Sequence, residues 1–160
     1  MIELPRIVRT AAQPTAVVHV TIPREEIRQV MGPGRQELMA AVAAQGIATD
    51  GPGFSHHFRM DPRTFDFEIG VPVATPIAAA GRVQPAQLPA ATVARTVYHG
   101  GYEGLAGAWG ELDSWIAAAG HQPGPDLWEC YVAGPESSPD PANWRTELNR
   151  PLVRLAEAHG

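Results

Sequence analysis

Apolar and polar positions in the first half of the chain predict two strands and then a helix. Residues 3–10 alternate weakly, and Pro5 favours an edge strand because proline cannot donate a ladder hydrogen bond. Residues 15–21 are rich in β-branched side chains and predict a strand that ends at Pro23. Residues 24–45 carry apolar side chains at spacings of three, four and seven, which is the period of a helix.

Three residues should interrupt this helix. Pro33 lacks an amide hydrogen and clashes with the preceding turn, and Gly32 and Gly34 flank it. We therefore expect a short helical turn, a break, and a main helix over about residues 35–44. Gly46 follows at the position where a left-handed residue commonly ends a helix.

Two more strands complete the first half, and the same order of elements then recurs. Residues 54–60 and 65–71 predict strands joined by a turn at Asp61-Pro62. Residues 74–86, rich in Ala and Pro, predict a linker. Beyond it we expect a strand, a loop, a helix that ends at Gly120, and two strands, over residues 87–98, 99–101, 102–119, 127–132 and 144–152.

The second half also repeats the first in sequence. Residues 61–73 align without a gap on residues 140–152. Four identities fall in this block, and others lie upstream in the same order: Asp61, Pro62, Glu68 and Pro72 with Asp140, Pro141, Glu147 and Pro151; Glu37-Leu38 with Glu111-Leu112; Gly46 with Gly120; Gly51-Pro52 with Gly124-Pro125; Thr15 with Thr92; Val20 with Val97. Two copies of about 75 residues are too few and too long for a solenoid.

The repeat instead indicates a single domain over residues 1–160, built from half-modules at about 1–73 and 87–155 that are related by a pseudo-two-fold axis. The predicted fold class is α+β, with tandem β-α-β-β modules that form an antiparallel sheet and two main helices on one of its faces. The other face is then free to curve around a ligand. Such an axis usually leaves a cleft, where ligands tend to bind.

Composition narrows the class of protein. Apolar residues make up 44% of the chain and charged residues 18%, as in globular proteins. The net charge of −5 argues against nucleic acid as a partner. No signal peptide and no stretch of 18 apolar residues is present, so we expect a cytoplasmic protein without a membrane partner. Cys130 is the single cysteine and has no zinc-ligand spacing around it, so we expect no metal and no cofactor.

Residues 127–132, Leu-Trp-Glu-Cys-Tyr-Val, give the strongest local signal for chemistry. Alternate residues of a strand share a face, so Glu129 and Tyr131 should point one way and Trp128 and Cys130 the other. A carboxylate among bulky apolar groups is costly to bury unless it meets a partner or a ligand. The alternative is that Glu129 lies in water on an exposed strand face.

The first copy offers a matching pair. Alignment of the two Gly-Pro pairs overlays His56 on Glu129 and Phe58 on Tyr131. Each copy then has a titratable side chain followed two residues later by an aromatic ring, and the two faces would meet across the cleft. The alternative is that His56 and His57 are surface or hydrogen-bonded histidines.

A second motif, Tyr98-His99-Gly100-Gly101-Tyr102, precedes the second helix. Its glycines permit a tight loop, but the Lys-Ser/Thr ending of a phosphate-binding loop is missing. Tyr98 and Tyr102 would line the cleft, or would instead pack against the start of the helix. The spacing of Trp109 and Trp115 on that helix predicts core packing.

Together these motifs resemble the GyrI-like small-molecule-binding family, the effector-binding domain also fused to MerR-type and AraC-type multidrug-responsive regulators. The resemblance covers about residues 8–152 and depends on the duplicated halves and on residues 98–112, 127–131 and 146–152. It implies two modules around a concave, aromatic-lined pocket, in which the glutamate at position 129 faces bulky, often cationic aromatic ligands. No helix-turn-helix segment is recognisable, so direct transcriptional control is not expected.

The sequence therefore predicts a stand-alone protein that binds bulky, lipophilic, often cationic aromatic compounds. The predicted ligand-binding residues are Glu129, Trp128, Tyr131, Tyr98, Tyr102, His56 and Phe58. The alternative comes from a subfamily that Trp128-Glu129-Cys130-Tyr131 resembles, whose members hydrolyse the cyclopropane ring of DNA-alkylating cyclopropanoid natural products. In that case Glu129 and Tyr131 would be catalytic, because a desolvated carboxyl has a raised pKa and can act as an acid or orient water. A partner-binding role through the sheet edge at residues 3–10 is a third possibility.

Overall fold

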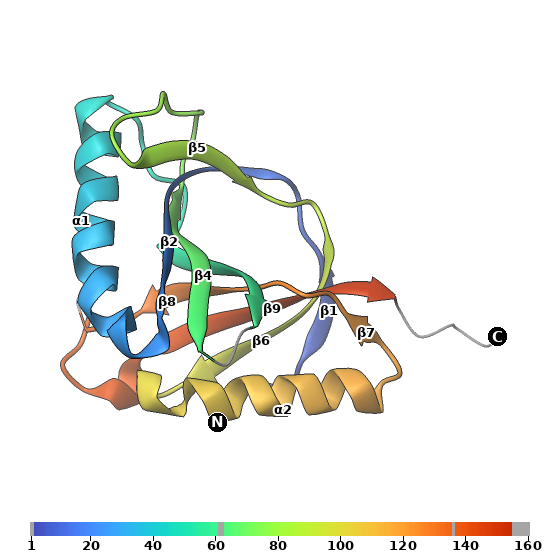
Figure 1. Cartoon of the computed structure of the whole chain (residues 1–160). Coiled ribbons are helices and arrows are strands. Elements are labelled where there is room, and N and C mark those ends of the chain that lie inside the picture. The colour runs from blue at the N-terminus through green and yellow to red at the C-terminus, as the bar shows by residue number, and fades with distance from the viewer. Residues whose placement is uncertain (1, 61–62, 136, 155–160) are drawn as a thin grey trace. The chain divides into compact units, whose positions relative to one another are not determined.

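The computed structural model describes residues 2–60, 63–135 and 137–154. The chain divides into two compact units, unit 1 with residues 1–10 and 91–160, and unit 2 with residues 11–90. Within the described residues each unit contains one α-helix and antiparallel strands, which confirms the predicted α+β class (Figure 1). Neither helix in this part of the chain has the length and apolar character needed to cross a bilayer.

Unit 2 consists of helix α1 (Ile27–Ala44) packed on one face of a sheet. The strands lie in the order β3 (Phe54–Met60), β4 (Thr64–Pro72), β2 (Gln13–Pro23) and β5 (Val83–Leu88). Alternate residues of β2 and β4 face the helix, and the core includes Val18, Leu38, Val42 and Phe67. The strands predicted over 15–21, 54–60 and 65–71 are thus confirmed, and the turn predicted at Asp61-Pro62 lies outside the described residues.

The predicted break in the first helix is wrong. A short 3₁₀ turn, η1 (Arg24–Glu26), leads into α1, which then continues through Pro33. Proline has a helical φ and removes one hydrogen bond, and the burial of Leu38 and Val42 outweighs that loss. Gly34 contributes by allowing close packing, since a Cβ atom there would lie 2.6 Å from Cδ1 of Ile69.

The linker predicted over residues 74–86 is also partly wrong, because β5 begins inside it. Val83 and Leu88 of β5 are buried, and the strand pairs with β2. The strand predicted over 87–98 is in fact two, since β6 begins only at Thr92. Pro85 obscures β5 in the sequence, and proline is tolerated because β5 is the outer strand of its sheet.

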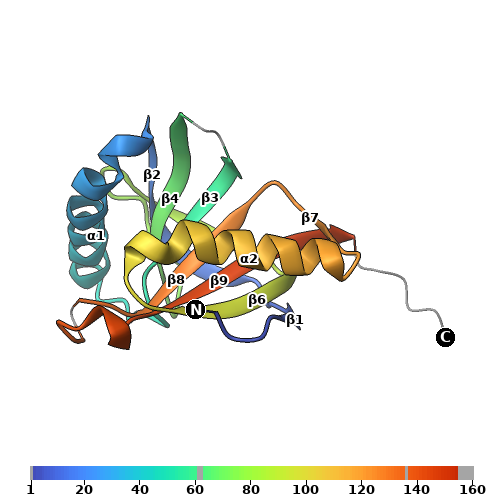
Figure 2. The same ribbon diagram turned by 90° about the horizontal axis from the view of Figure 1, so that it is seen from below.

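Unit 1 consists of helix α2 (Leu105–Ala118), preceded by the 3₁₀ turn η2 (Tyr102–Gly104), on one face of a second set of strands (Figure 2). These strands lie in the order β1 (Arg6–Arg9), β6 (Thr92–His99), β9 (Arg145–Arg154) and β8 (Leu127–Ala133), and the short β7 (Gln122–Pro123), which was not predicted, pairs with β9. Another 3₁₀ turn, η3 (Pro141–Asn143), precedes β9. The core under the helix consists of Ala94, Tyr98, Ala108, Leu112, Ile116 and Leu148.

The two sequence repeats exchange the strands that lead into them. β1 precedes β2 in the chain but pairs with β6 of unit 1, and β5 precedes β6 but pairs with β2 of unit 2. The segment before β1 joins the same edge, because the Glu3 amide donates to the Val97 carbonyl (2.9 Å) and Thr96 Oγ1 donates to the Glu3 carbonyl (2.7 Å). The predicted edge strand is therefore present, and its partner belongs to the second repeat.

Both helices end in the same way, as the repeat predicts. Gly46 and Gly120 have positive φ angles of 66° and 80°. In each case the glycine amide and the next amide donate back into the last helical turn: Gly46 to Ala43, Ile47 to Val42, Gly120 to Ala117 and His121 to Ile116. This pattern is the Schellman motif, which satisfies carbonyls that the helix end leaves unpaired.

Candidate functional site

Glu129 lies on the face of β8 that α2 covers. It is paired across the sheet with Leu148, a fully buried core residue. The indole Nε1 of Trp109, on α2, donates to Oε1 of Glu129 (2.6 Å), and the hydroxyl of Tyr131 donates to Oε2 (3.0 Å). The shared face of Glu129 and Tyr131 is confirmed, and Glu129 is partly buried against α2 rather than lying on a fully exposed strand face.

The surroundings of this carboxyl change its acid strength. Burial raises the pKa of Glu129 above its ordinary value, and the hydrogen bonds from Trp109 and Tyr131 offset this only in part. A neutral carboxyl is thus favoured over a wider pH range than in water. The same group can act as a proton donor, or can ionise when a positive charge approaches.

Two further rings extend the aromatic surroundings. Tyr102, on η2, lies 6.0 Å from Tyr131 and 5.0 Å from Trp144, centroid to centroid. The Nε1 group of Trp144 donates to the Ser138 carbonyl (2.8 Å), which fixes the indole. Tyr102 is 39% exposed. We call the set Glu129, Trp109, Tyr131, Tyr102 and Trp144 the aromatic site.

Two members of the aromatic site were not predicted as ligand-binding residues. The spacing of Trp109 was assigned to core packing, and Trp144 only marked the start of a strand. A buried carboxylate needs hydrogen-bond donors. An indole N–H on the helix that covers Glu129 was therefore the signal that could have identified Trp109. Nothing local to Trp144 distinguishes it, because the chain places it beside Tyr102 through tertiary structure.

Tyr98 packs the start of the second helix, which is the alternative that its motif left open. Its ring is 7% exposed in the core of unit 1, and its hydroxyl donates to the Gly101 carbonyl (2.8 Å). A Cβ atom at Gly100 or Gly104 would lie 2.8 or 2.0 Å from that hydroxyl. These two glycines therefore make room for Tyr98.

Trp128 and Cys130 lie on the opposite face of β8, as the alternation predicts. Trp128 is buried. Near Cys130, Arg95 Nε donates to Asn149 Oδ1 (2.7 Å), and Asn149 Nδ2 donates to Glu147 Oε1 (3.2 Å). Burial, together with the charge of Glu147, raises the pKa of the Cys130 thiol to about 12, so it stays protonated and unreactive.

In unit 2, His56 and Phe58 lie on the face of the sheet turned away from α1. Their rings are 4.7 Å apart, and His19 lies 5.7 Å from Phe58. Glu68 shares this face; burial raises its pKa, and the imidazoles of His56 and His19 oppose the shift. No group of three His, Cys, Asp or Glu within residues 2–60, 63–135 and 137–154 is placed to hold a metal ion.

The overlay of His56 on Glu129 is wrong by one residue. His56 pairs with Glu68 across the sheet, and Cys130 pairs with Glu147. Since Glu68 and Glu147 align in the repeat, the counterpart of His56 is Cys130. A slip of one residue moves a side chain to the other face of a strand, and the Gly-Pro pairs lie outside the strand, where the two copies differ in length.

The true counterparts of Glu129 and Tyr131 are Ser55 and His57, which face α1. Nε2 of His57 lies 3.2 Å from Oγ of Ser55, and its ring stacks on Phe67 at 4.8 Å. Unit 2 thus has a polar pair at the equivalent place but no carboxylate there. The carboxylate chemistry on the helix-covered face is specific to the second repeat.

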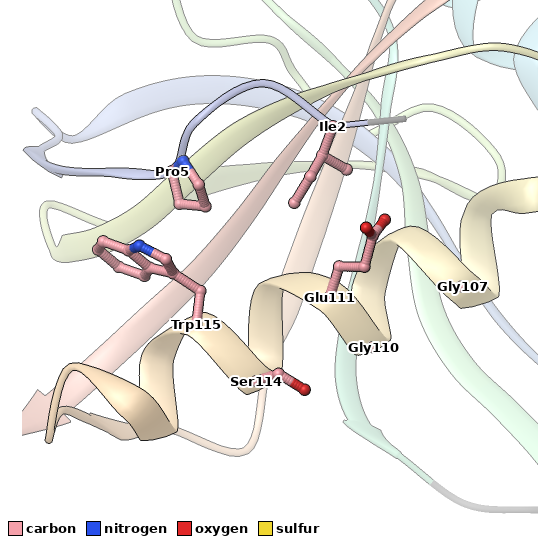
Figure 3. A pocket seen from close by; sticks show the side chains of 7 residues that line it. All are labelled: Ile2, Pro5, Gly107, Gly110, Glu111, Ser114 and Trp115. Carbon is pink, nitrogen blue, oxygen red and sulfur yellow. The ribbon is translucent and has the colours of Figure 1, made fainter.

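A separate cavity of about 640 Å³ lies between the N-terminal segment and α2 (Figure 3). It is lined by Ile2, Pro5, Gly107, Gly110, Glu111, Ser114 and Trp115 (Figure 3). Its lining includes one carboxylate, that of the exposed Glu111, and none of the predicted ligand-binding residues. Because the buried acid and its donors lie elsewhere, we take the aromatic site as the candidate.

A family model described as GyrI-like small molecule binding domain matches residues 4–153. The crystal structure of the EcmrR C-terminal domain is similar to this chain with a TM-score of 0.84 and 20% identity, over 95% of this chain and 98% of that one. The EcmrR chain in the cryo-EM structure of the EcmrR–DNA complex is similar to this chain with a TM-score of 0.83 and 20% identity. The match covers 95% of this chain and only 58% of that longer chain.

Two more distant structures share the fold. SAV2435 bound to tetraphenylphosphonium is 11% identical with a TM-score of 0.65, over 94% of each chain. A hydrolase encoded by lin2189 from Listeria innocua is 12% identical with a TM-score of 0.67, over 93% of this chain and 91% of that one. At these identities the likeness shows the fold alone. No match to the sequence was found among curated proteins.

Proposed function

Because the chain belongs to the GyrI-like family of small-molecule-binding domains, we propose that it binds bulky, lipophilic, often cationic aromatic compounds at the aromatic site. The observation that carries this proposal is the partly buried carboxyl of Glu129, which accepts hydrogen bonds from Trp109 and Tyr131 among further rings. The complex of SAV2435 with tetraphenylphosphonium, a lipophilic cation, supports the class of ligand. Ligand contacts by His56 and Phe58 remain predictions.

Magnitudes indicate which contacts should dominate. Covering ~200 Å² of aromatic surface contributes about 5 kcal/mol, before the cost of association. A cation over a tyrosine or tryptophan ring adds about 0.5–2 kcal/mol. The free energy from covering ring surface depends on the area covered and little on the detailed structure of the ligand. We therefore expect many ligands of similar bulk to bind. Charge preference must then come from Glu129 together with the cation–π contribution of the rings, and only the Glu129 part is removed by neutralising that side chain.

Glu129 also couples binding to protons. Burial raises its pKa, so in the empty site the neutral acid persists to a higher pH than it does in water. A cation favours the ionised carboxylate, and its binding should therefore release a proton. The affinity for cations is accordingly weak below the pKa of Glu129 in the empty protein, and it rises as the pH increases through that value.

The test uses two ions of the same shape and opposite charge. We expect the wild-type protein to bind tetraphenylphosphonium more tightly than tetraphenylborate in calorimetric titrations at pH 8. Glu129→Gln keeps an acceptor for Trp109 and a partner for Tyr131 but removes the charge. It should weaken tetraphenylphosphonium binding about tenfold, or ~1.4 kcal/mol, and leave tetraphenylborate unchanged or tighter.

Asp113→Asn is the matched control, because Asp113 is an exposed carboxylate on α2, the helix that carries Trp109. It should change neither affinity by more than about twofold. Equal losses for both ions in the Glu129 variant would contradict the charge argument. Binding of neither ion to the wild-type protein would contradict the proposed function as a whole.

A second candidate function is hydrolysis of cyclopropanoid compounds, favoured by the raised pKa of Glu129 beside the Tyr131 hydroxyl. In a cyclopropane conjugated to a carbonyl, a proton or hydrogen bond on the carbonyl oxygen lets water attack a ring carbon. A C–O bond forms, a ring C–C bond breaks, its electrons form an enol, and the water proton is finally passed to carbon. A product heavier by one water, seen by mass spectrometry and lost with Glu129→Gln, would establish turnover, whereas unchanged substrate leaves binding alone.

A further inference from the structure

Thr146 carries a buried hydroxyl at the floor of the aromatic site. It lies on β9, directly opposite Tyr98 of β6 on one side and Tyr131 of β8 on the other. Directly opposed residues of adjacent strands share a face, so all three point toward α2. Thr146 is fully buried, and its Oγ1 has no hydrogen-bond partner among the described residues.

The neighbouring hydroxyl and indole donors already have acceptors within the protein. Tyr131 and Trp109 donate to Glu129, Tyr98 donates to the Gly101 carbonyl, and Trp144 donates to the Ser138 carbonyl. Thr146 is the group among these whose proton has no acceptor in the described structure. A buried hydroxyl without a partner costs free energy, and valine has the same shape with no such cost. Packing alone therefore does not account for a threonine here.

We propose that the Thr146 hydroxyl is a ligand-contacting group that donates a hydrogen bond to an oxygen acceptor on the bound compound. This inference rests on the proposed function and narrows its ligand class. Glu129 receives the positive part of the ligand, and Thr146 receives a carbonyl or ether oxygen on the ring system. The preferred ligand is then a lipophilic aromatic cation that also carries such an oxygen.

Tyr102 is the residue of the aromatic site that we expect an entering ligand to displace. It is the most exposed ring of the site, and it contacts Tyr131 edge to face. The turn η2 that holds it contains no buried residue, so its displacement uncovers no core side chain of that turn. An entering ring system can take its place against Tyr131 and Trp144, and its oxygen can then reach the hydroxyl of Thr146, the cross-strand neighbour of Tyr131.

The experiment compares two cations that differ in one atom group. In 4-acetylbenzyl-triphenylphosphonium a carbonyl oxygen stands where 4-isopropenylbenzyl-triphenylphosphonium has a CH₂ group of similar shape. The wild-type protein should bind the acetyl compound at least five times more tightly, or about 1 kcal/mol. Thr146→Val should abolish this difference by weakening the acetyl compound alone, and Thr146→Ser, which keeps the hydroxyl, should retain it within about twofold.

Thermal unfolding of the empty variants supplies a second measurement. Thr146→Val should unfold at a higher temperature than the wild type, because it removes an unpaired buried group. A lower unfolding temperature would show that the hydroxyl has a partner in the empty protein and would overturn the inference. Equal binding of both compounds, unchanged by Thr146→Val, would also overturn it while leaving the proposed function intact. Failure of both to bind the wild-type protein would instead contradict the proposed function.

Discussion

Burial acts on two titratable side chains in opposite directions. The pKa of Glu129 is raised because its charged form is the anion, and the pKa of His57 is lowered to about 4 because its charged form is the cation. Both groups lie on helix-covered faces. His57 corresponds to Tyr131 in the other repeat, two residues along the strand from Glu129. In each case the neutral form is the one that the protein interior stabilises.

His57 should make unit 2 sensitive to acid. Its pKa falls from 6.5 to about 4 on folding, so between these values the unfolded chain binds more protons. Stability from this group is therefore complete above pH 6.5 and is lost as the pH falls toward 4, by about 3 kcal/mol. His57→Phe keeps the ring stacked on Phe67 but does not titrate. Urea unfolding at pH 7 and pH 4.5, followed by far-UV circular dichroism, should show a smaller acid loss in the variant.

Arg24 and His56 also act on the His57 imidazole, and both disfavour its charged form. Their effect strengthens the expected acid loss in the wild type. An equal loss in the wild type and in His57→Phe would show that His57 is already solvated in the native protein. It would also contradict the stacked arrangement with Phe67.

Single-residue alternation predicted the faces of residues 127–132 correctly because the period of a strand is a local property. It could not predict which residues of the two copies correspond. Loops around Gly51-Pro52 and Gly124-Pro125 differ by one residue relative to the strands that follow, and sequence identity in the loops carried that error to His56. Trp109 and Trp144 were not predicted as site residues, because their positions beside Glu129 and Tyr102 depend on tertiary packing.

At the scale of elements, α1 shows how packing overrides a local helix breaker. The predicted interruption at residues 32–34 followed from helix propensity alone. Proline and glycine do lower the stability of a helix there, but that cost is not the only contribution. Leu38 and Val42 bury one face of the helix, and that gain holds the segment helical through Pro33. The two glycines beside the proline then have different roles, which substitution can separate.

Gly32→Ala and Gly34→Ala should have different effects on stability. A Cβ atom at Gly32 would meet nothing within 4 Å, so alanine should stabilise the helix by about 1 kcal/mol. At Gly34 the same atom would lie 2.6 Å from Cδ1 of the buried Ile69. The resulting shift should cost about 1–3 kcal/mol and cancel or reverse the gain.

Chemical unfolding of the two alanine variants at pH 7 measures this difference directly. A third variant, Gly34→Ala combined with Ile69→Val, removes the atom that clashes. It should recover part of the loss relative to Gly34→Ala alone. Equal stabilisation by both single substitutions would show that α1 stands further from β4 in solution than in this structure.

At the scale of the whole molecule, the exchanged strands are what the sequence could least predict. Local pattern identified residues 3–10 as strand and as an edge, both correctly. Its partner, β6, begins at Thr92, and the repeat itself suggested that each half keeps its own strands. Pairing across such a separation depends on contacts between segments that are far apart in the chain, so no short window of sequence contains it.

The aromatic residues provide probes for this exchange. All four tryptophans and all three tyrosines lie within unit 1, at positions 109, 115, 128, 144, 98, 102 and 131, and all four phenylalanines lie within unit 2, at 54, 58, 65 and 67. Tryptophan fluorescence therefore follows unit 1 directly. Changes at the start of the chain can then be assigned to one unit.

Deleting residues 2–9 should destabilise unit 1, although the nearest strand in sequence, β2, belongs to unit 2. The deletion removes the pairing of β1 with β6 and the bonds of Glu3 to Val97 and Thr96. Several net hydrogen bonds of about 1 kcal/mol each predict a loss of roughly 2–4 kcal/mol in urea unfolding followed by tryptophan fluorescence. Hydrogen exchange read by mass spectrometry should show faster exchange in β6 and unchanged protection in β2, because β1 makes no ladder with β2. The opposite pattern, with β2 exposed and β6 protected, would mean that the first strand stays with the first repeat and that the repeats do not exchange strands.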